Sequence, residues 1–155
     1  MADSASAGSL AGGEEEEGIL SSMCSVYFPV SEFSTRYGEQ FFTVSMEGGV
    51  IFDASPQMGS KHVRYALRIM YGQKSHVVHH RYSEFLALHH KLVPLGLQSK
   101  VVRVPPKTCS RLFKDPFDPN FIERRAEGLY TYLHSVMQDR TAIDSALVRD
   151  FLDLP

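Results

Sequence analysis

Three short basic segments hold the residues of this chain whose types and spacing could do chemistry. They are Arg81-Tyr82-Ser83-Glu84-Phe85, Pro105-Pro106-Lys107 and Phe121-Ile122-Glu123-Arg124-Arg125. We expect the first at the end of a strand, the second in a proline turn and the third on a helix. A guanidinium can donate two parallel hydrogen bonds to one phosphate, and a lysine adds a less directional charge. Cations spaced in this way can gather around one anionic headgroup once the chain is folded.

The apolar pattern before and within the first basic segment predicts strands. Val63 to Tyr71 alternates apolar residues with arginines, which is typical of a half-buried antiparallel strand. Gly72-Gln73-Lys74 predicts a hairpin turn, and Ser75 to Arg81 a returning strand. Val50 to Ala54 predicts one more strand, which a turn or bulge at Gly48-Gly49 separates from strand-like residues upstream.

Helical spacing follows the strands. We expect Ser83 to cap a helix whose apolar face holds Phe85, Leu88 and Leu92, and Pro94 with Gly96 to end it.

A long connection then reaches Asp118-Pro119, a capping acid followed by a proline in the first turn. The helix that it starts should run to about Met137. Thr141 with Asp144 has the spacing of a capping box before a short last helix. Strands followed by helices place the chain in the α+β class, with a three-stranded antiparallel sheet packed on three to four helices and a proline-rich crossing.

Charge and composition divide the chain into three parts. Residues 1–60 hold one basic and nine acidic residues, whereas residues 61–155 hold fifteen basic and nine acidic ones. We expect residues 1–23 to be a disordered acidic leader, because they are small and polar. Residues 24–48 form an extension for which an extra strand and an extended edge both stay open. Residues 49–155 form the folded, basic domain, and its charge suggests an anionic partner.

Several functional classes find little support in the sequence. Cys24 and Cys109 lack the spacing of a metal site and fit reduced thiols. No apolar run approaches the roughly 20 residues of a transmembrane helix, so any membrane contact should be peripheral. His79-His80 and His89-His90 are adjacent pairs whose side chains do not converge, and no nucleophile motif appears, so we do not expect an enzyme. The dispersed basic residues accompany no recognised nucleic-acid module.

The order of elements and the three basic segments resemble the PX (phox-homology) domain of the small sorting nexins. The resemblance covers roughly residues 49–155. It implies a phosphoinositide-binding module that reads phosphatidylinositol 3-phosphate on early endosomal membranes, as a cytoplasmic, peripheral trafficking adaptor without metal or cofactor. Cargo or coat proteins would be its protein partners. The alternative is a protein-interaction module on the same fold with weak or altered lipid binding.

The resemblance also implies a role for single residues. Arg81 matches the family arginine that grips the 3-phosphate, and Tyr82 the tyrosine beneath the inositol ring. Lys107 matches the lysine that meets the 1-phosphate. Arg125 has the register of the arginine that bonds the 4- and 5-hydroxyls, and Arg124 is expected on a solvated helix face. A surface pair between Arg81 and Glu84 is the alternative for the first arginine.

The segment after the proline pair holds two apolar residues between two cations, Arg111-Leu112-Phe113-Lys114. It suits a loop tip that enters the membrane interface while its cations meet lipid phosphates. The alternative is that Leu112 and Phe113 fold inward onto the helices. His79 and His80 precede Arg81, which raises the hypothesis that acidification strengthens lipid binding. Two strand histidines without such a role are the alternative.

Overall fold

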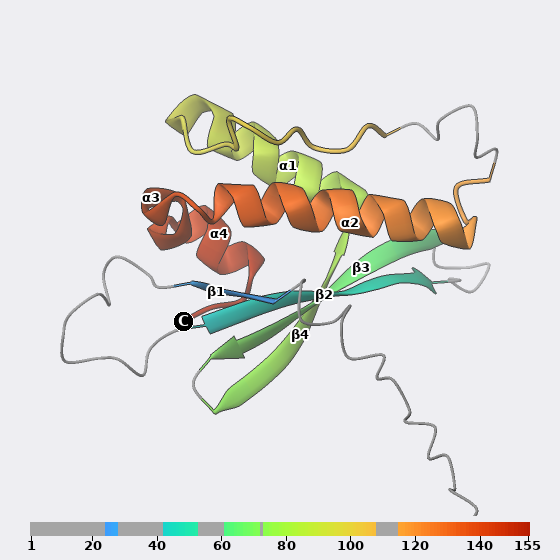
Figure 1. Cartoon of the computed structure of the whole chain (residues 1–155), viewed down its shortest axis with the longest axis horizontal. Helices are drawn as coiled ribbons and strands as arrows, with labels where there is room; N and C mark the ends of the chain where they lie inside the picture. Colours follow the sequence, from blue (N-terminus) through green and yellow to red (C-terminus); the bar gives the residue numbers. More distant parts are fainter. Residues whose placement is uncertain (1–23, 28–41, 53–60, 72, 108–114) are drawn as a thin grey trace, which may run out of the picture.

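One antiparallel sheet carries the helices on a single face. The computed structural model describes residues 24–27, 42–52, 61–71, 73–107 and 115–155. The strands lie in the order β1 (Cys24–Tyr27), β2 (Phe42–Phe52), β3 (His62–Tyr71) and β4 (Lys74–Arg81). The predicted three-stranded sheet is confirmed as β2-β3-β4, and β1 adds a short strand to the outer edge of β2 (Figure 1). Both β1 and the first half of β2 fall in the segment 24–48.

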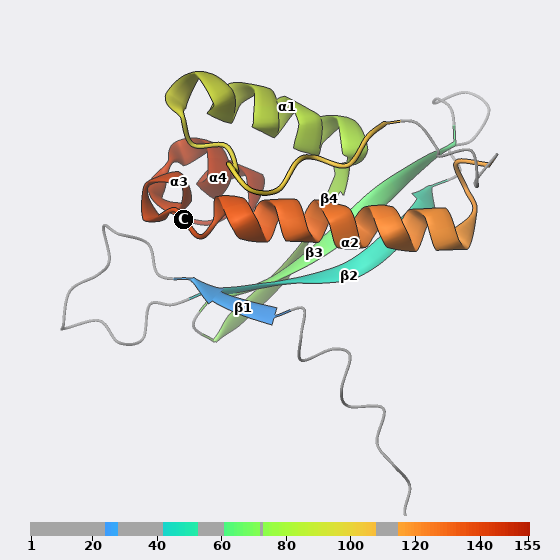
Figure 2. The ribbon, with the colours of Figure 1, turned by 45° about the horizontal axis from the view of Figure 1, so that its top comes forward.

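In the described part of the chain, the helical layer consists of four α-helices and one 3-10 turn. They are α1 (Tyr82–Leu92), η3 (Val93–Leu95), α2 (Pro119–Val136), α3 (Arg140–Asp144) and α4 (Ala146–Phe151). Residues 97–107, which we call the proline segment, run back along the two long helices and lie between α1 and α2 (Figure 2). This path brings the proline pair close to both helices.

Alternation along β3 places the core on the helical side of the sheet. Tyr65, Leu67 and Ile69 are buried, whereas Arg68 is exposed. The apolar stripes of α1 and α2 cover them, as the sequence predicts. The buried residues of these two helices are Phe85, Leu88, Leu92, Phe121, Ile122, Ala126, Leu129, Tyr130, Tyr132, Leu133 and Val136.

The glycine pair in β2 is a bulge and not the end of a strand. The register with β3 shifts between Met46 and Gly48, and Gly48 has a φ of 110°, which favours glycine. At Gly49 a Cβ would lie 2.2 Å from Ile122 Cγ2. The missing side chain therefore lets α2 approach the strand closely.

Two of the three predicted helix caps are wrong. Helix α1 begins at Tyr82, so Ser83 lies inside its first turn, and Glu84 Oε2 accepts a hydrogen bond from the Arg81 N–H at 2.6 Å. Helix α3 is capped by Asp139, whose Oδ1 accepts from the Thr141 N–H at 2.8 Å. In both places a nearby carboxylate accepts from a backbone amide at the start of the helix. The Asp118 cap is confirmed, because its Oδ1 accepts from two amides at 2.9 and 3.1 Å.

A polar contact joins the two long helices across the core. His89 Nδ1 lies 2.9 Å from the hydroxyl oxygen of the fully buried Tyr132. Burial lowers the pKa of His89 below its ordinary value of 6.5, and the neighbouring His90 lowers that pKa further. The neutral imidazole can accept the tyrosine hydrogen, whereas the charged imidazole cannot.

We predict that the free energy of unfolding falls as the pH drops below 6.5, in part through His89. The unfolded chain takes up a proton there before the folded one does, so stability rises with pH in this window. In the variant His89→Gln, the free energy of unfolding should fall less steeply as the pH drops. Urea unfolding of both proteins at pH 7.5, 6.5 and 5.5 measures this, and identical profiles would contradict the assignment.

Candidate functional site

A cavity of about 330 Å³ opens where α1, α2 and the proline segment meet the start of β3. Four residues that the sequence proposes for one headgroup, Arg81, Tyr82, Lys107 and Arg125, all line this cavity. The complete lining is His62, Val63, Tyr65, Arg81, Tyr82, Ser83, Lys107, Pro116, Phe117 and Arg125. The fold therefore brings together all three basic segments, which are separated by as many as 44 positions along the chain.

Arg81 reaches the cavity from the junction of β4 and α1. Its backbone is extended, with φ −76° and ψ 158°, and its N–H is held by Glu84. The second carboxylate oxygen of Glu84 lies 3.6 Å from His80 Nδ1. The guanidinium of Arg81 makes no hydrogen bond or ion pair with the described residues. The alternative of a surface pair between the side chains of Arg81 and Glu84 is not formed.

Tyr82 joins the start of α1 to the proline segment. Its half-buried hydroxyl donates a hydrogen bond to the Pro105 carbonyl at 2.6 Å. The guanidinium of Arg125 lies over the Tyr82 ring, 4.6 Å from its centroid. One side chain thus fixes the proline segment and supports a cation.

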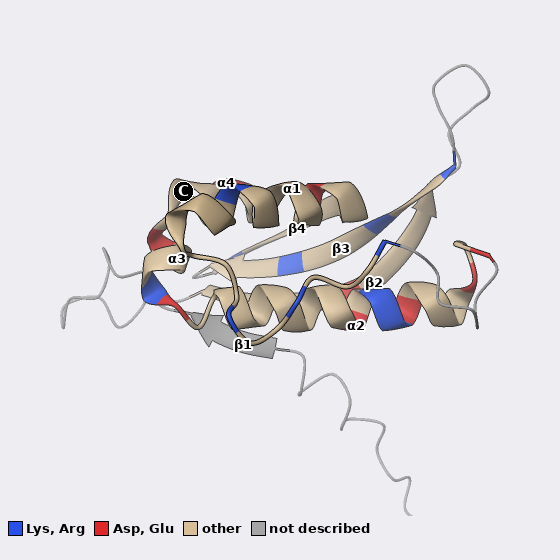
Figure 3. Cartoon of the chain, turned by 90° about the horizontal axis from the view of Figure 1, so that it is seen from above, with Lys and Arg blue, Asp and Glu red and all other residues tan. Residues whose placement is uncertain are grey.

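Arg125 is the most constrained cation at the cavity. Its guanidinium also lies 4.2 Å from the centroid of Phe121, so two aromatic rings hold it. Its Nη2 donates to the carbonyls of Pro106, at 3.3 Å, and of Lys107, at 2.5 Å. Figure 3 shows the basic end of the proline segment beside the basic turn of α2. These contacts set the backbone from which the exposed Lys107 side chain extends.

A glycine in α2 permits the proline segment to lie close to the helix. A Cβ at Gly128 would be 2.6 Å from Pro105 Cγ. Within a helix, glycine lowers stability by about 1 kcal/mol relative to alanine. Here its lack of a side chain is what lets Pro105 rest on α2, one helical turn from Arg125.

The other residues proposed from the sequence lie away from the cavity or outside the described chain. Arg124 is exposed and does not line the cavity, as expected. His80 does not line it either, since its ring stacks on Phe151 with centroids 3.8 Å apart. The proposed membrane loop, Arg111 to Lys114, lies outside the described residues.

Two parts of the cavity wall escape the sequence analysis. Pro116 and Phe117 form one wall, with Lys61 Nζ 4.5 Å from the centroid of the Phe117 ring. His62 and Val63 at the start of β3 form another. An apolar residue directly before the Asp118 cap is a signal that could have pointed to Phe117.

Comparison with known proteins decides the family. The family model of the PX domain matches residues 69–155. The chain belongs to the PX domain family. A designed CISK-PX domain is 27% identical, with a TM-score of 0.58, and the match covers 70% of this chain and 95% of that one. The mouse SNX19 PX domain, solved with a bound sulphate ion, is 23% identical with a TM-score of 0.55, covering 72% and 95%.

PX domains are in general non-catalytic modules that bind phosphoinositides and target proteins to membranes. A search of curated protein sequences finds no match. Among the described residues, no helix is long and apolar enough to span a bilayer. The same residues contain no group of three or more His, Cys, Asp or Glu side chains that could hold a metal ion.

We predict that Gly128→Ala disturbs the cavity lined by Arg81, Tyr82, Lys107 and Arg125. The added methyl group meets Pro105, so the proline segment must shift away from α2. Overpacking of this kind costs about 1–3 kcal/mol, which exceeds the gain in helix propensity. Urea unfolding measures the loss. Glu127→Ala, at the exposed neighbouring position, is the control and should change stability by less than about 0.5 kcal/mol. Equal or greater stability of Gly128→Ala would refute the contact.

Proposed function

We propose that this PX domain binds phosphatidylinositol 3-phosphate and acts as a peripheral, sorting-nexin-like adaptor on early endosomal membranes. The observation that supports it is the meeting of Arg81, Tyr82, Lys107 and Arg125 at one cavity. Ligand pockets usually measure about 300–1,000 Å³, so this cavity suits a single small headgroup.

Arg81 is the residue that we assign to the 3-phosphate. Its guanidinium has no ion pair among the described residues, because Glu84 is engaged by a backbone amide. A phosphate that enters the cavity can therefore accept two parallel hydrogen bonds from it without first breaking an internal pair. The resulting charge-assisted contact is the strongest that these side chains offer.

The remaining three residues orient the sugar. The Tyr82 ring gives the inositol an apolar floor, and Lys107 meets the 1-phosphate, which joins the headgroup to the lipid. Arg125 faces the 4- and 5-hydroxyls. Because two rings and two carbonyls hold its guanidinium, it cannot withdraw to admit further phosphates at these positions. We infer that selectivity rests on this exclusion.

The chain leaves the described structure at Lys107 and returns at Asp115, beside the cavity wall formed by Pro116. A loop that joins these points starts and ends next to the headgroup site. We propose that Leu112 and Phe113 enter the lipid interface while Arg111 and Lys114 contact phosphates. Each such cation adds about 1 kcal/mol near an anionic surface.

We predict that Arg81→Ala and Arg125→Ala each weaken binding to liposomes that carry phosphatidylinositol 3-phosphate by roughly 10- to 100-fold. The loss of one charge-assisted hydrogen bond, worth about 1.5–3 kcal/mol, is the reason. Arg124→Ala is the matched control, since it removes the same charge from the same helix outside the cavity. Sedimentation with liposomes, each containing one member of the full set of phosphoinositides, measures affinity and preference.

Circular dichroism should show that all three variants stay folded, because Arg81 and Arg124 are exposed and the half-buried Arg125 is not part of the buried core. An equal loss of liposome affinity in Arg124→Ala would mean that net charge alone accounts for binding, and it would reject the proposed site. A wild-type preference for lipids phosphorylated at the 4- or 5-position would reject the assigned selectivity.

A further inference from the structure

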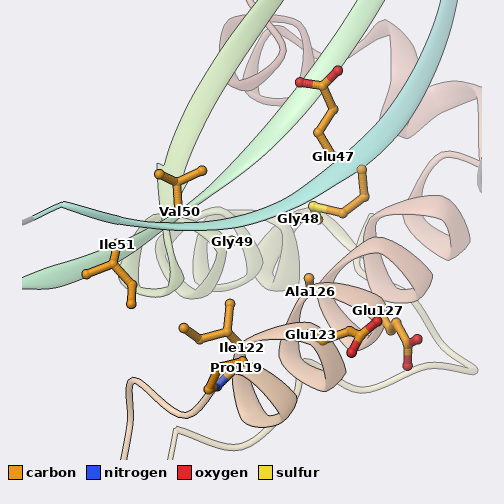
Figure 4. A pocket seen from close by; sticks show the side chains of 11 residues that line it. Glu47, Gly48, Gly49, Val50, Ile51, Pro119, Ile122, Glu123, Ala126 and Glu127 are labelled. Carbon is orange, nitrogen blue, oxygen red and sulfur yellow. The ribbon is translucent and has the colours of Figure 1, made fainter.

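A second hollow, of about 610 Å³, lies between β2 and the first half of α2. Its walls are the bulged part of β2, from Met46 to Ile51, and the helix residues Pro119, Ile122 and Ala126. Figure 4 shows Pro119 and Ile122 directed from α2 toward the strand. Arg125 does not line this hollow but lines the headgroup cavity. The two depressions therefore use different faces of α2.

Among the described strands, none pairs with the outer edge of β2 along this hollow. Strand β1 pairs only with Phe42 to Ser45, while β3 occupies the inner edge as far as Phe52. From Met46 onward, no strand in the described part of the chain pairs with the outer edge. An open edge presents backbone donors and acceptors to which an extended peptide can add as a further strand.

The floor of the hollow can bury apolar side chains. Met46, Ile122 and Ala126 are buried beneath it. Val50 and Ile51, at its rim, keep 47% and 42% of their surface exposed. A strand added to the outer edge of β2 would cover part of this apolar surface, and alternate side chains would point toward α2.

Two carboxylates line the α2 side of the hollow and set the charge of its occupant. Glu123 and Glu127 are exposed, one helical turn apart on α2, and neither makes an ion pair with the described residues. The carboxylate of Glu47, on β2, is directed away from α2 (Figure 4) and pairs with Arg68. This charge is opposite to that of the headgroup cavity and favours a basic occupant.

We propose that this groove binds an extended, basic segment of another protein, in which Lys or Arg residues alternate with apolar ones. The segment adds to the outer edge of β2 between Glu47 and Ile51, buries its apolar side chains over Ile122 and Ala126, and directs its cations to Glu123 and Glu127. Peptide binding at this groove does not depend on lipid binding, because Arg81 and Arg125 do not line the groove.

A blocked, fluorescein-labelled heptapeptide of alternating lysine and valine tests the proposal by fluorescence anisotropy with the full chain. A peptide of the same composition, with its lysines and valines in two separate blocks, is the control for charge alone. We expect the alternating peptide to bind at least about tenfold more tightly than the block peptide. The double variant Glu123→Lys, Glu127→Lys should lower its affinity at least about tenfold, while Asp150→Lys, an exposed site on α4, should leave it unchanged.

Peptide titration should shift the amide NMR signals of Met46 to Ile51. The double variant should still sediment with phosphatidylinositol 3-phosphate liposomes. These two results together would support peptide binding at the groove. Equal affinity of the two peptides, equal binding by the double variant, or no saturation at about 1 mM peptide would overturn it. Concentration-dependent dimers that the double variant abolishes would overturn it too, because a second copy would then be the occupant.

Discussion

The position of Arg125 is the constraint on which the headgroup cavity depends. Its guanidinium is held between the rings of Tyr82 and Phe121 and donates to the carbonyls of Pro106 and Lys107. One side chain on α2 thereby ties together the start of α1 and the end of the proline segment. The cation that would read the sugar is also the one that shapes its own cavity, so its geometry is set before any ligand binds.

Helix α2 separates two surfaces of opposite charge. One face carries Arg125 and, through Gly128, the proline segment, while the other carries Glu123 and Glu127 beside the open edge of β2. A PX domain arranged in this way could bind an anionic headgroup and a basic polypeptide at the same time. Two sites of this kind on one domain would hold a membrane and a protein together.

Periodicity predicted most of the fold, because the core depends on patterns that repeat over many residues. The inward stripe of β3 and the apolar face of α2 follow directly from it. The predicted capping residues Ser83 and Thr141 were wrong. At both places several polar residues lie within a few positions, and the backbone geometry decides which of them caps the helix. The types of the site residues were visible, but the bonds of Arg125 to two carbonyls and the wall formed by Phe117 arise only in three dimensions.

An NMR titration with soluble, short-chain phosphatidylinositol 3-phosphate tests whether this cavity binds the headgroup, and it needs neither a membrane nor a variant. The account predicts saturable shifts at the amides of Arg81, Tyr82 and Lys107 and at the side-chain Nε of Arg81 and Arg125. Shifts confined to other surfaces, or none at saturating lipid, would contradict it, because the cavity would then not be the place where this domain reads a headgroup.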